Sequence, residues 1–178
     1  MSKPVLQIEL WNEADPQLEE RDKAAIAAFA ADLQYVPPIV DEKVVTHGSW
    51  TGRLPVWPFD RTAPEGLDAL VPDGALVSLH YPSAYPMVPP RVYVLDPEPT
   101  IQQYTQHAWH VAPGGSLCLL QTENDWTPET TPVDLLLKAC GWRIEFALME
   151  SGLIESMTTN GIVNDPSRDH LLTEAASL

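Results

Sequence analysis

The sequence is poor in basic residues: 10 Lys and Arg stand against 25 Asp and Glu, which gives the 178-residue chain a formal net charge of −15. Because Lys and Arg hold phosphate groups, this balance argues against binding of nucleic acid or of anionic lipid. Long apolar runs and an apolar N-terminal leader are also lacking, so neither a membrane span nor a signal peptide is expected. Two cysteines are too few for a disulfide framework. We therefore expect a cytoplasmic protein that binds neither nucleic acid nor membranes.

The chain has the length of one domain, and its patterns predict an α+β layout. Asp15 and Pro16 have the form of a helix N-cap and first turn, and an apolar stripe continues to Leu33 with residues 19–23 facing water. Strands are expected within 44–59, 75–81 and 91–95, followed by a long segment without period and a buried helix from Thr131 to about Met149. We assign a single domain to 1–178, with a core at about 15–150 and a variable tail at 151–178.

Cys118 is the strongest candidate for chemistry. It follows Gly114 and Gly115 on a segment without helical period and comes eight residues after His110, so a carbonyl could reach the thiol. Cys140 lies on an apolar helical stripe and is expected to be a small buried residue. A zinc site formed by His107, His110 and Cys118 is disfavoured, because no CxxC partner or fourth ligand is present.

Two other readings stay open at this point. A Cys–His hydrolase needs a base that is hydrogen-bonded to the thiol and a third group that orients the base, and acids such as Asp125 are near in sequence. His80, within an expected strand, is interpreted as structural.

Three strings with fixed order and spacing carry a family resemblance. The first is Leu79–Val92, which fits the pattern I-x-F-P-x-x-Y-P-x-x-P-P-x-V except at its first and third positions; the second is Gly115, Leu117 and Cys118; the third is Trp126-Thr127-Pro128 followed by Thr131. Together they resemble a ubiquitin-conjugating enzyme over about residues 15–150. The resemblance implies that family's fold: an N-terminal helix, an antiparallel meander, a long active-site loop and a buried helix after the active site.

The resemblance also implies a function. Cys118 would take the acyl group of a ubiquitin-like protein from an activating enzyme as a thioester, without a cofactor or metal, and pass it to an amine on a protein target. The loop around Cys118 would be supported by matching residues of the three strings, namely Tyr85, Pro89, Pro90, Gly115, Trp126 and Pro128. Alternatives are an inactive family member that acts as a binding module and the unrelated Cys–His hydrolase.

The sequence departs from the family at three places. His110 replaces the family's asparagine, Leu120 replaces a common aspartate, and the segment from Asp96 to Gln106 is longer. We hypothesise that His110 donates to the oxyanion and acts as a base. Such divergence resembles bacterial members that work in antiphage defence.

Charge is unevenly distributed around Cys118. Between Val92 and Leu137 there is no Lys or Arg but there are six acids, and the lysines stand only at positions 3, 23, 43 and 138. The acids are expected to raise the pKa of the thiol and to attract basic partners. We further expect a thioester on Cys118 to have no lysine nearby. Asp125 and Glu129 are interpreted as solvated loop acids.

Overall fold

The computed structural model describes residues 9–41, 44–104, 106–122, 125–158 and 161–175. Helix α2 (Pro16–Phe29) begins where the sequence predicts, because Asp15 accepts hydrogen bonds from the backbone N–H groups of Gln17 (3.1 Å) and Leu18 (3.2 Å). These bonds satisfy donors that lack partners within the helix. Helix α5 (Pro132–Glu150) likewise begins after Thr131, whose N–H donates to the Asp134 carboxylate at 3.2 Å.

Four antiparallel strands form the main sheet in the order β1-β4-β5-β6, which confirms an α+β fold with an antiparallel sheet. A separate two-stranded hairpin pairs β2 with β3. The sequence did not predict β1 or β2, because Pro37 and Pro38 between them indicated only the end of a helix. The strands have these bounds: β1 Gln34–Val36, β2 Ile39–Val40, β3 Val45–Thr46, β4 Ser49–Arg53, β5 Leu76–His80 and β6 Arg91–Asp96.

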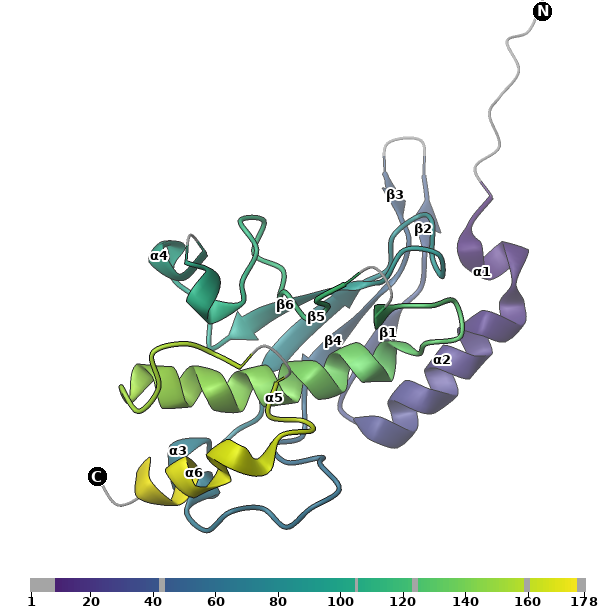
Figure 1. The fold of residues 1–178 in the computed structure, drawn as a ribbon. Helices are drawn as coiled ribbons and strands as arrows, with labels where there is room; N and C mark the ends of the chain where they lie inside the picture. Colours follow the sequence, from purple (N-terminus) through teal and green to yellow (C-terminus); the bar gives the residue numbers. More distant parts are fainter. Residues whose placement is uncertain (1–8, 42–43, 105, 123–124, 159–160, 176–178) are drawn as a thin grey trace, which may run out of the picture.

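Helix α5 lies across one face of the sheet, and α2 lies beside its N-terminal end (Figure 1). Val77 and Leu79 of β5 and Leu136 and Ile144 of α5 are completely buried between these layers. Cys140 on α5 is buried, as predicted. The remaining helices are short: α1 Trp11–Ala14, α3 Leu67–Leu70, α4 Ile101–Tyr104, η1 His107–Trp109, η3 Pro166–Arg168 and α6 Asp169–Ala175.

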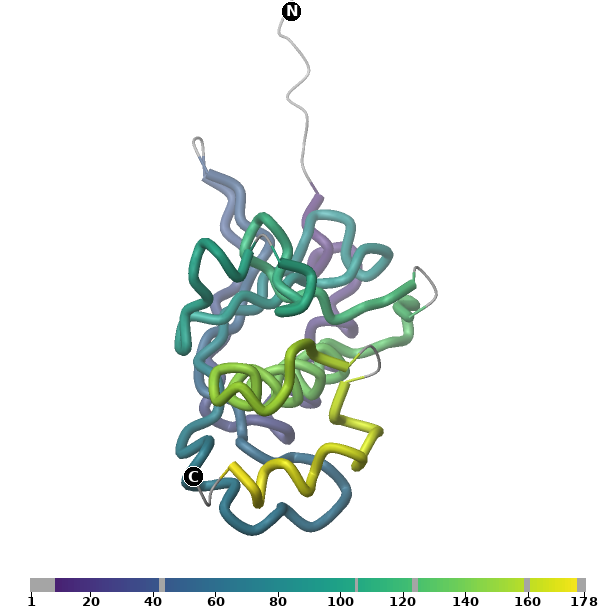
Figure 2. The backbone as a smooth tube through the Cα atoms, turned by 60° about the vertical axis from the view of Figure 1, so that its left-hand side comes forward, coloured from purple at the N-terminus to yellow at the C-terminus, as the bar shows by residue number. Residues whose placement is uncertain are grey.

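The C-terminal segment turns back along α5, and α6 lies beside α3 in both Figure 1 and Figure 2. Arg61, between β4 and α3, fastens this segment. Its guanidinium donates to the carbonyl oxygens of Val163 (2.9 Å) and Ile162 (2.8 Å) and pairs with Asp169 at 2.7 Å. Backbone carbonyls and the Asp169 carboxylate both hold the segment, whose Ile162 and Leu172 side chains are buried in the core.

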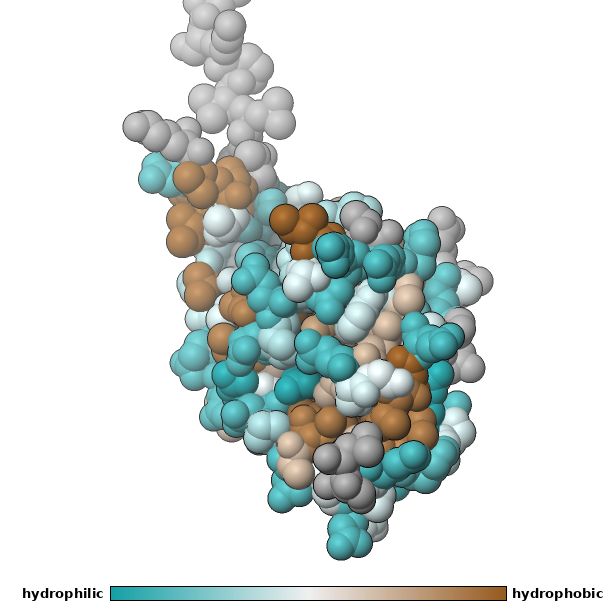
Figure 3. All heavy atoms as spheres, turned by 90° about the vertical axis from the view of Figure 1, so that its left-hand side faces the viewer, coloured by the Kyte–Doolittle hydropathy of each residue, from teal (hydrophilic) through white to brown (hydrophobic). Residues whose placement is uncertain are grey.

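Apolar side chains are exposed mainly where the β2–β3 hairpin projects. Ile39, Val40, Val44 and Val45 are among them, and brown atoms gather at the upper edge of the face in Figure 3, where the hairpin lies. None of the helices in the described ranges has both the length and the apolar character that a bilayer crossing requires.

Candidate functional site

Cys118 lies on a backbone segment that is fixed on two sides. Its N–H donates to the carbonyl oxygen of His110 at 2.8 Å, and the N–H of Leu117 donates to the carbonyl oxygen of Val92 in β6 at 2.8 Å. The thiol itself is exposed, whereas that of Cys140 is buried. The protein thus presents one of its two thiols to solvent from a held position.

His110 has a left-handed backbone conformation, with φ 50° and ψ 39°. Among residues with a side chain, Asn, Asp and His adopt this conformation more readily than most. A histidine can therefore stand at a position where the similar family has asparagine without disturbing the turn before Cys118.

The imidazole of His110 and the thiol of Cys118 line the same pocket. The structure gives no hydrogen bond between this ring and Sγ, although both residues are described. A Cys–His hydrolase requires that bond between base and nucleophile, so this geometry does not favour the hydrolase.

Gly115 occupies the tight turn between His110 and Cys118. Its φ is +86°, and its N–H donates to the carbonyl oxygen of Ala112 at 2.8 Å. A Cβ at this position would lie 3.9 Å from the Tyr93 ring, which is an ordinary contact. Glycine is favoured here because the backbone is left-handed, and not because space is lacking.

The proline-rich crossing (residues 82–90) and the segment before α5 are joined by a hydrogen bond. The indole N–H of Trp126 donates to the carbonyl oxygen of Pro86 at 2.8 Å, and both Trp126 and Tyr85 are buried. Pro90, at the end of the crossing, is also buried. A second hollow shares Gln121 with the pocket that contains Cys118, and it is lined by Met87, Val88, Pro89, Leu120, Gln121, Thr122 and Trp126.

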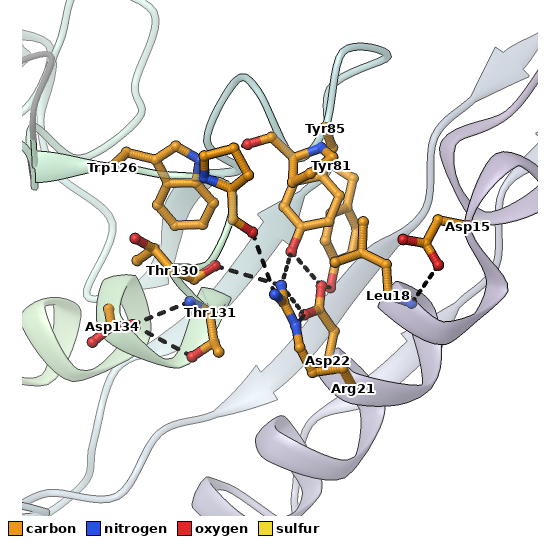
Figure 4. Close-up of polar contacts among 12 residues, drawn as sticks. Asp15, Leu18, Arg21, Asp22, Tyr81, Tyr85, Trp126, Thr130, Thr131 and Asp134 are labelled. Carbon is orange, nitrogen blue, oxygen red and sulfur yellow. Dashed lines mark hydrogen bonds and ion pairs between the residues drawn. The ribbon is translucent and has the colours of Figure 1, made fainter.

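A buried aspartate connects α2 to both of these segments (Figure 4). Asp22 is 1% exposed and accepts hydrogen bonds from the hydroxyls of Tyr81 (3.1 Å) and Tyr85, as well as from Arg21 at 2.9 Å. Arg21 also donates to the carbonyl oxygen of Pro128 at 3.3 Å. The expectation that residues 19–23 all face water is therefore wrong for Asp22.

The protonation of the two tyrosines follows from this burial. Burial and the neighbouring Asp22 carboxylate raise the pKa of Tyr81 and of Tyr85. Both hydroxyls therefore stay protonated and remain donors to Asp22. Sequence spacing gave no sign of this cluster, because Asp22 and its tyrosine partners are far apart along the chain.

A pocket of about 50 Å³ lies between Cys118 and α5. Lys138, Trp142 and Glu145 contribute the α5 side. The C-terminal segment closes the pocket with Met157, Thr158, Gly161 and Val163, while His110, Leu119 and Gln121 complete the lining. Glu145 is buried and accepts hydrogen bonds from Thr158 and from Arg168 at 3.0 Å.

Two expectations about charge at this site need correction. Partial burial raises the pKa of Cys118, so the direction is the predicted one, but desolvation causes it and the neighbouring acids do not. The expected lack of a nearby lysine is also wrong, because Lys138 lines the pocket that contains Cys118. Twenty residues separate them in sequence, and only the packing of α5 against the loop brings them together.

Asp125 is a loop acid, as interpreted, and shapes the backbone after Cys118. Its carboxylate accepts hydrogen bonds from the N–H groups of Gln121 (2.7 Å) and Thr122 (3.0 Å). These bonds hold the pKa of Asp125 below its ordinary value, and the positive charge of Lys138 adds to the effect. Asp125 therefore lies near Lys138 while its oxygens are occupied by the loop.

The other histidine of interest lies elsewhere. His80 ends β5, where its Nε2 is 2.7 Å from the Ser78 hydroxyl and its ring meets Tyr93 edge-on. Within the described ranges, no three His, Cys, Asp or Glu side chains are clustered in a way that could hold a metal ion.

Comparison of the chain with models of known protein families finds no match, and comparison with curated proteins finds none either.

Proposed function

We propose that this protein is a ubiquitin-conjugating-type acyltransferase with the corresponding α+β fold. Cys118 receives the C-terminal acyl group of a ubiquitin-like protein from an activating enzyme, as a thioester, and passes it to an amine on a protein target. The observation that carries the proposal is the exposed thiol of Cys118 on a backbone segment held by His110 and β6, in a pocket along α5 that shares Gln121 with a second hollow.

The arrangement around the thiol supports this chemistry. An incoming carbonyl needs an exposed sulfur, and a ubiquitin-like tail needs open surface on both sides of it. The pocket along α5 and the second hollow, which share Gln121, supply open surface around the Cys118 segment. Trp126 and its bond to the carbonyl of Pro86 keep the two flanking segments together.

His110 supplies a second functional group in the same pocket. Transfer from a thioester passes through a tetrahedral oxyanion, which is stabilised by a donor aimed at the developing charge. His110 lines the same pocket as Cys118 and its ring makes no hydrogen bond to Sγ, so the ring is available to an oxygen that develops in the pocket. We assign His110 the roles of oxyanion donor and of base for the attacking amine.

The raised pKa of Cys118 has a functional meaning under this proposal. Only the thiolate attacks, so partial burial keeps the resting thiol less reactive toward adventitious electrophiles. Reaction then depends on an acyl group that is already activated. An adenylating enzyme supplies such a group, and we place the protein in a bacterial conjugation pathway of the cytoplasm that serves antiphage defence.

The deciding experiment is a charging assay. The full chain is incubated with its cognate activating enzyme, ATP and the ubiquitin-like protein, and is then run on a non-reducing gel. We expect an adduct that thiols remove, that persists in Cys140→Ala and that Cys118→Ser converts to a thiol-resistant ester or loses.

Other outcomes count against the proposal. Absence of an adduct while the activating enzyme is itself charged would favour an inactive binding module. Turnover of a peptide or ester without ATP would favour a hydrolase.

A further inference from the structure

The lysines at α2 and α5 differ in what holds their ammonium groups. Lys23 on α2 pairs with Glu19 (3.3 Å) and Glu20 (3.2 Å) and lies over the Tyr35 ring. Lys138 on α5 is half-buried and has neither a hydrogen bond nor an ion pair with any part of the chain that the structure describes. Its amine is therefore free to react, whereas that of Lys23 is held by two carboxylates.

One face of α5 connects Lys138 to the loop that bears Cys118. Residues three and four apart share a helix face, so Lys138, Trp142 and Glu145 follow one another along the pocket. The indole of Trp142 donates to the carbonyl oxygen of Trp109 at 2.8 Å. His110 follows Trp109 in the chain, and its carbonyl oxygen accepts a hydrogen bond from the N–H of Cys118. Lys138 and Cys118 thus line one pocket whose walls are joined by hydrogen bonds.

We propose that Lys138 is an internal acceptor for the acyl group carried by Cys118, so that the protein modifies itself when no target arrives. The inference rests on the proposed function, since it requires an acyl thioester at Cys118. Nζ of Lys138, in its neutral form, attacks the thioester carbonyl. The new C–N bond forms, the C–S bond breaks, and the proton lost by nitrogen passes through water to the sulfur, which leaves as the Cys118 thiol.

The product regulates the same site. An amide at Lys138 is stable to thiols, unlike the thioester that preceded it, so the modification accumulates. Because Lys138 lines the pocket next to Cys118, the attached chain occupies the space that the next acyl group requires. Charging of the protein therefore becomes self-limiting.

The test uses a small probe that needs no activating enzyme: the thioester of acetylglycine with 2-mercaptoethanesulfonate. Exchange with Cys118 places acetylglycine on the thiol and releases mercaptoethanesulfonate. With the probe at about 0.1 mM, and tethered groups at effective concentrations in the millimolar range, we expect about tenfold more amide on Lys138 than on Lys23. Peptide mapping after thiol treatment measures both.

Matched variants separate transfer through Cys118 from direct acylation. Cys118→Ala should lower the amide at Lys138 to the level at Lys23. Lys138→Arg should keep the thioester and lose the amide. Adding Gln121→Lys, in the same pocket, to Lys138→Arg should restore an amide, while Ala28→Lys on the exposed side of α2 should not.

Equal labelling of Lys138 and Lys23, or labelling of Lys138 that survives Cys118→Ala, overturns the inference. The two proposals fail separately. If the probe reaches Lys138 but the adenylating enzyme never charges Cys118, the proposed function falls and this inference stands. If charging with the ubiquitin-like protein succeeds while Lys138 stays unmodified in both assays, this inference falls and the proposed function stands.

Discussion

Replacing Asp22 is expected to cost more stability than replacing any exposed acid of the chain. Asp22 is 1% exposed and accepts hydrogen bonds from the hydroxyls of Tyr81 and Tyr85. Both tyrosines are 4% exposed. In Asp22→Ala both hydroxyls lose their acceptor. Each buried donor left without a partner costs about 1–3 kcal/mol, whereas Arg21 is a third exposed and can turn to water.

We therefore expect Asp22→Ala to lower the free energy of unfolding by about 3–5 kcal/mol, within the range that the two buried donors give together. Asp22→Asn keeps one acceptor oxygen and loses the charge, so about 1–2 kcal/mol is expected. Asp32→Ala, at an exposed aspartate just after α2, is the control and should stay within about 0.5 kcal/mol of the wild type.

Urea unfolding followed by tryptophan fluorescence measures all three variants. Trp50, whose indole donates to the Tyr81 hydroxyl at 3.1 Å, reports on the same cluster. If Asp22→Ala loses less than about 1 kcal/mol, comparable to the spread of surface substitutions, then the network in Figure 4 does not stabilise the crossing and the reasoning fails. Asp22→Asn keeps the test informative should Asp22→Ala fail to fold.

Three further predictions concern the site. Partial burial raises the pKa of Cys118, so the rate of its alkylation by iodoacetamide should increase with pH and reach its midpoint above pH ~8.5, the pKa of a free thiol. Mass spectrometry measures this rate, and a midpoint below that pH contradicts the desolvation argument. His110→Gly keeps the left-handed backbone and removes the ring, so it should slow discharge of the thioester without loss of unfolding free energy. His110→Ala removes the ring but keeps the Cβ that histidine already has in this conformation, so it should slow discharge in the same way. Wild-type formation and discharge rates in both variants would refute a catalytic ring. With a net charge of −15, charging of Cys118 by basic partners should slow as NaCl increases, and a rate independent of salt removes that prediction.

Local chemistry made much of the fold predictable. Asp15 with Pro16, and Thr131 with Pro132, marked the starts of both long helices because capping depends on residues adjacent in sequence. The strands around Pro37 and Pro38 were missed because a proline pair ends a helix and can also separate two strands, and local sequence does not distinguish these cases.

The site was predictable in its residue types and not in its contacts. Cys118 and His110 stand out through their spacing, and the structure places both on one pocket. The burial of Asp22 and the position of Lys138 both depend on packing between segments far apart in sequence. A charged residue on a helix is exposed by default, and only partners from elsewhere in the chain change that.

The way Arg61 holds the C-terminal segment bears on how the pocket can change during evolution. Two of its bonds go to the backbone oxygens of Ile162 and Val163, and every residue type supplies such an oxygen. Val163, which lines the pocket with Cys118, can therefore be exchanged while its carbonyl keeps the bond to Arg61. Under the proposed function, such exchanges would fit the pocket wall to different ubiquitin-like tails while this attachment stays in place.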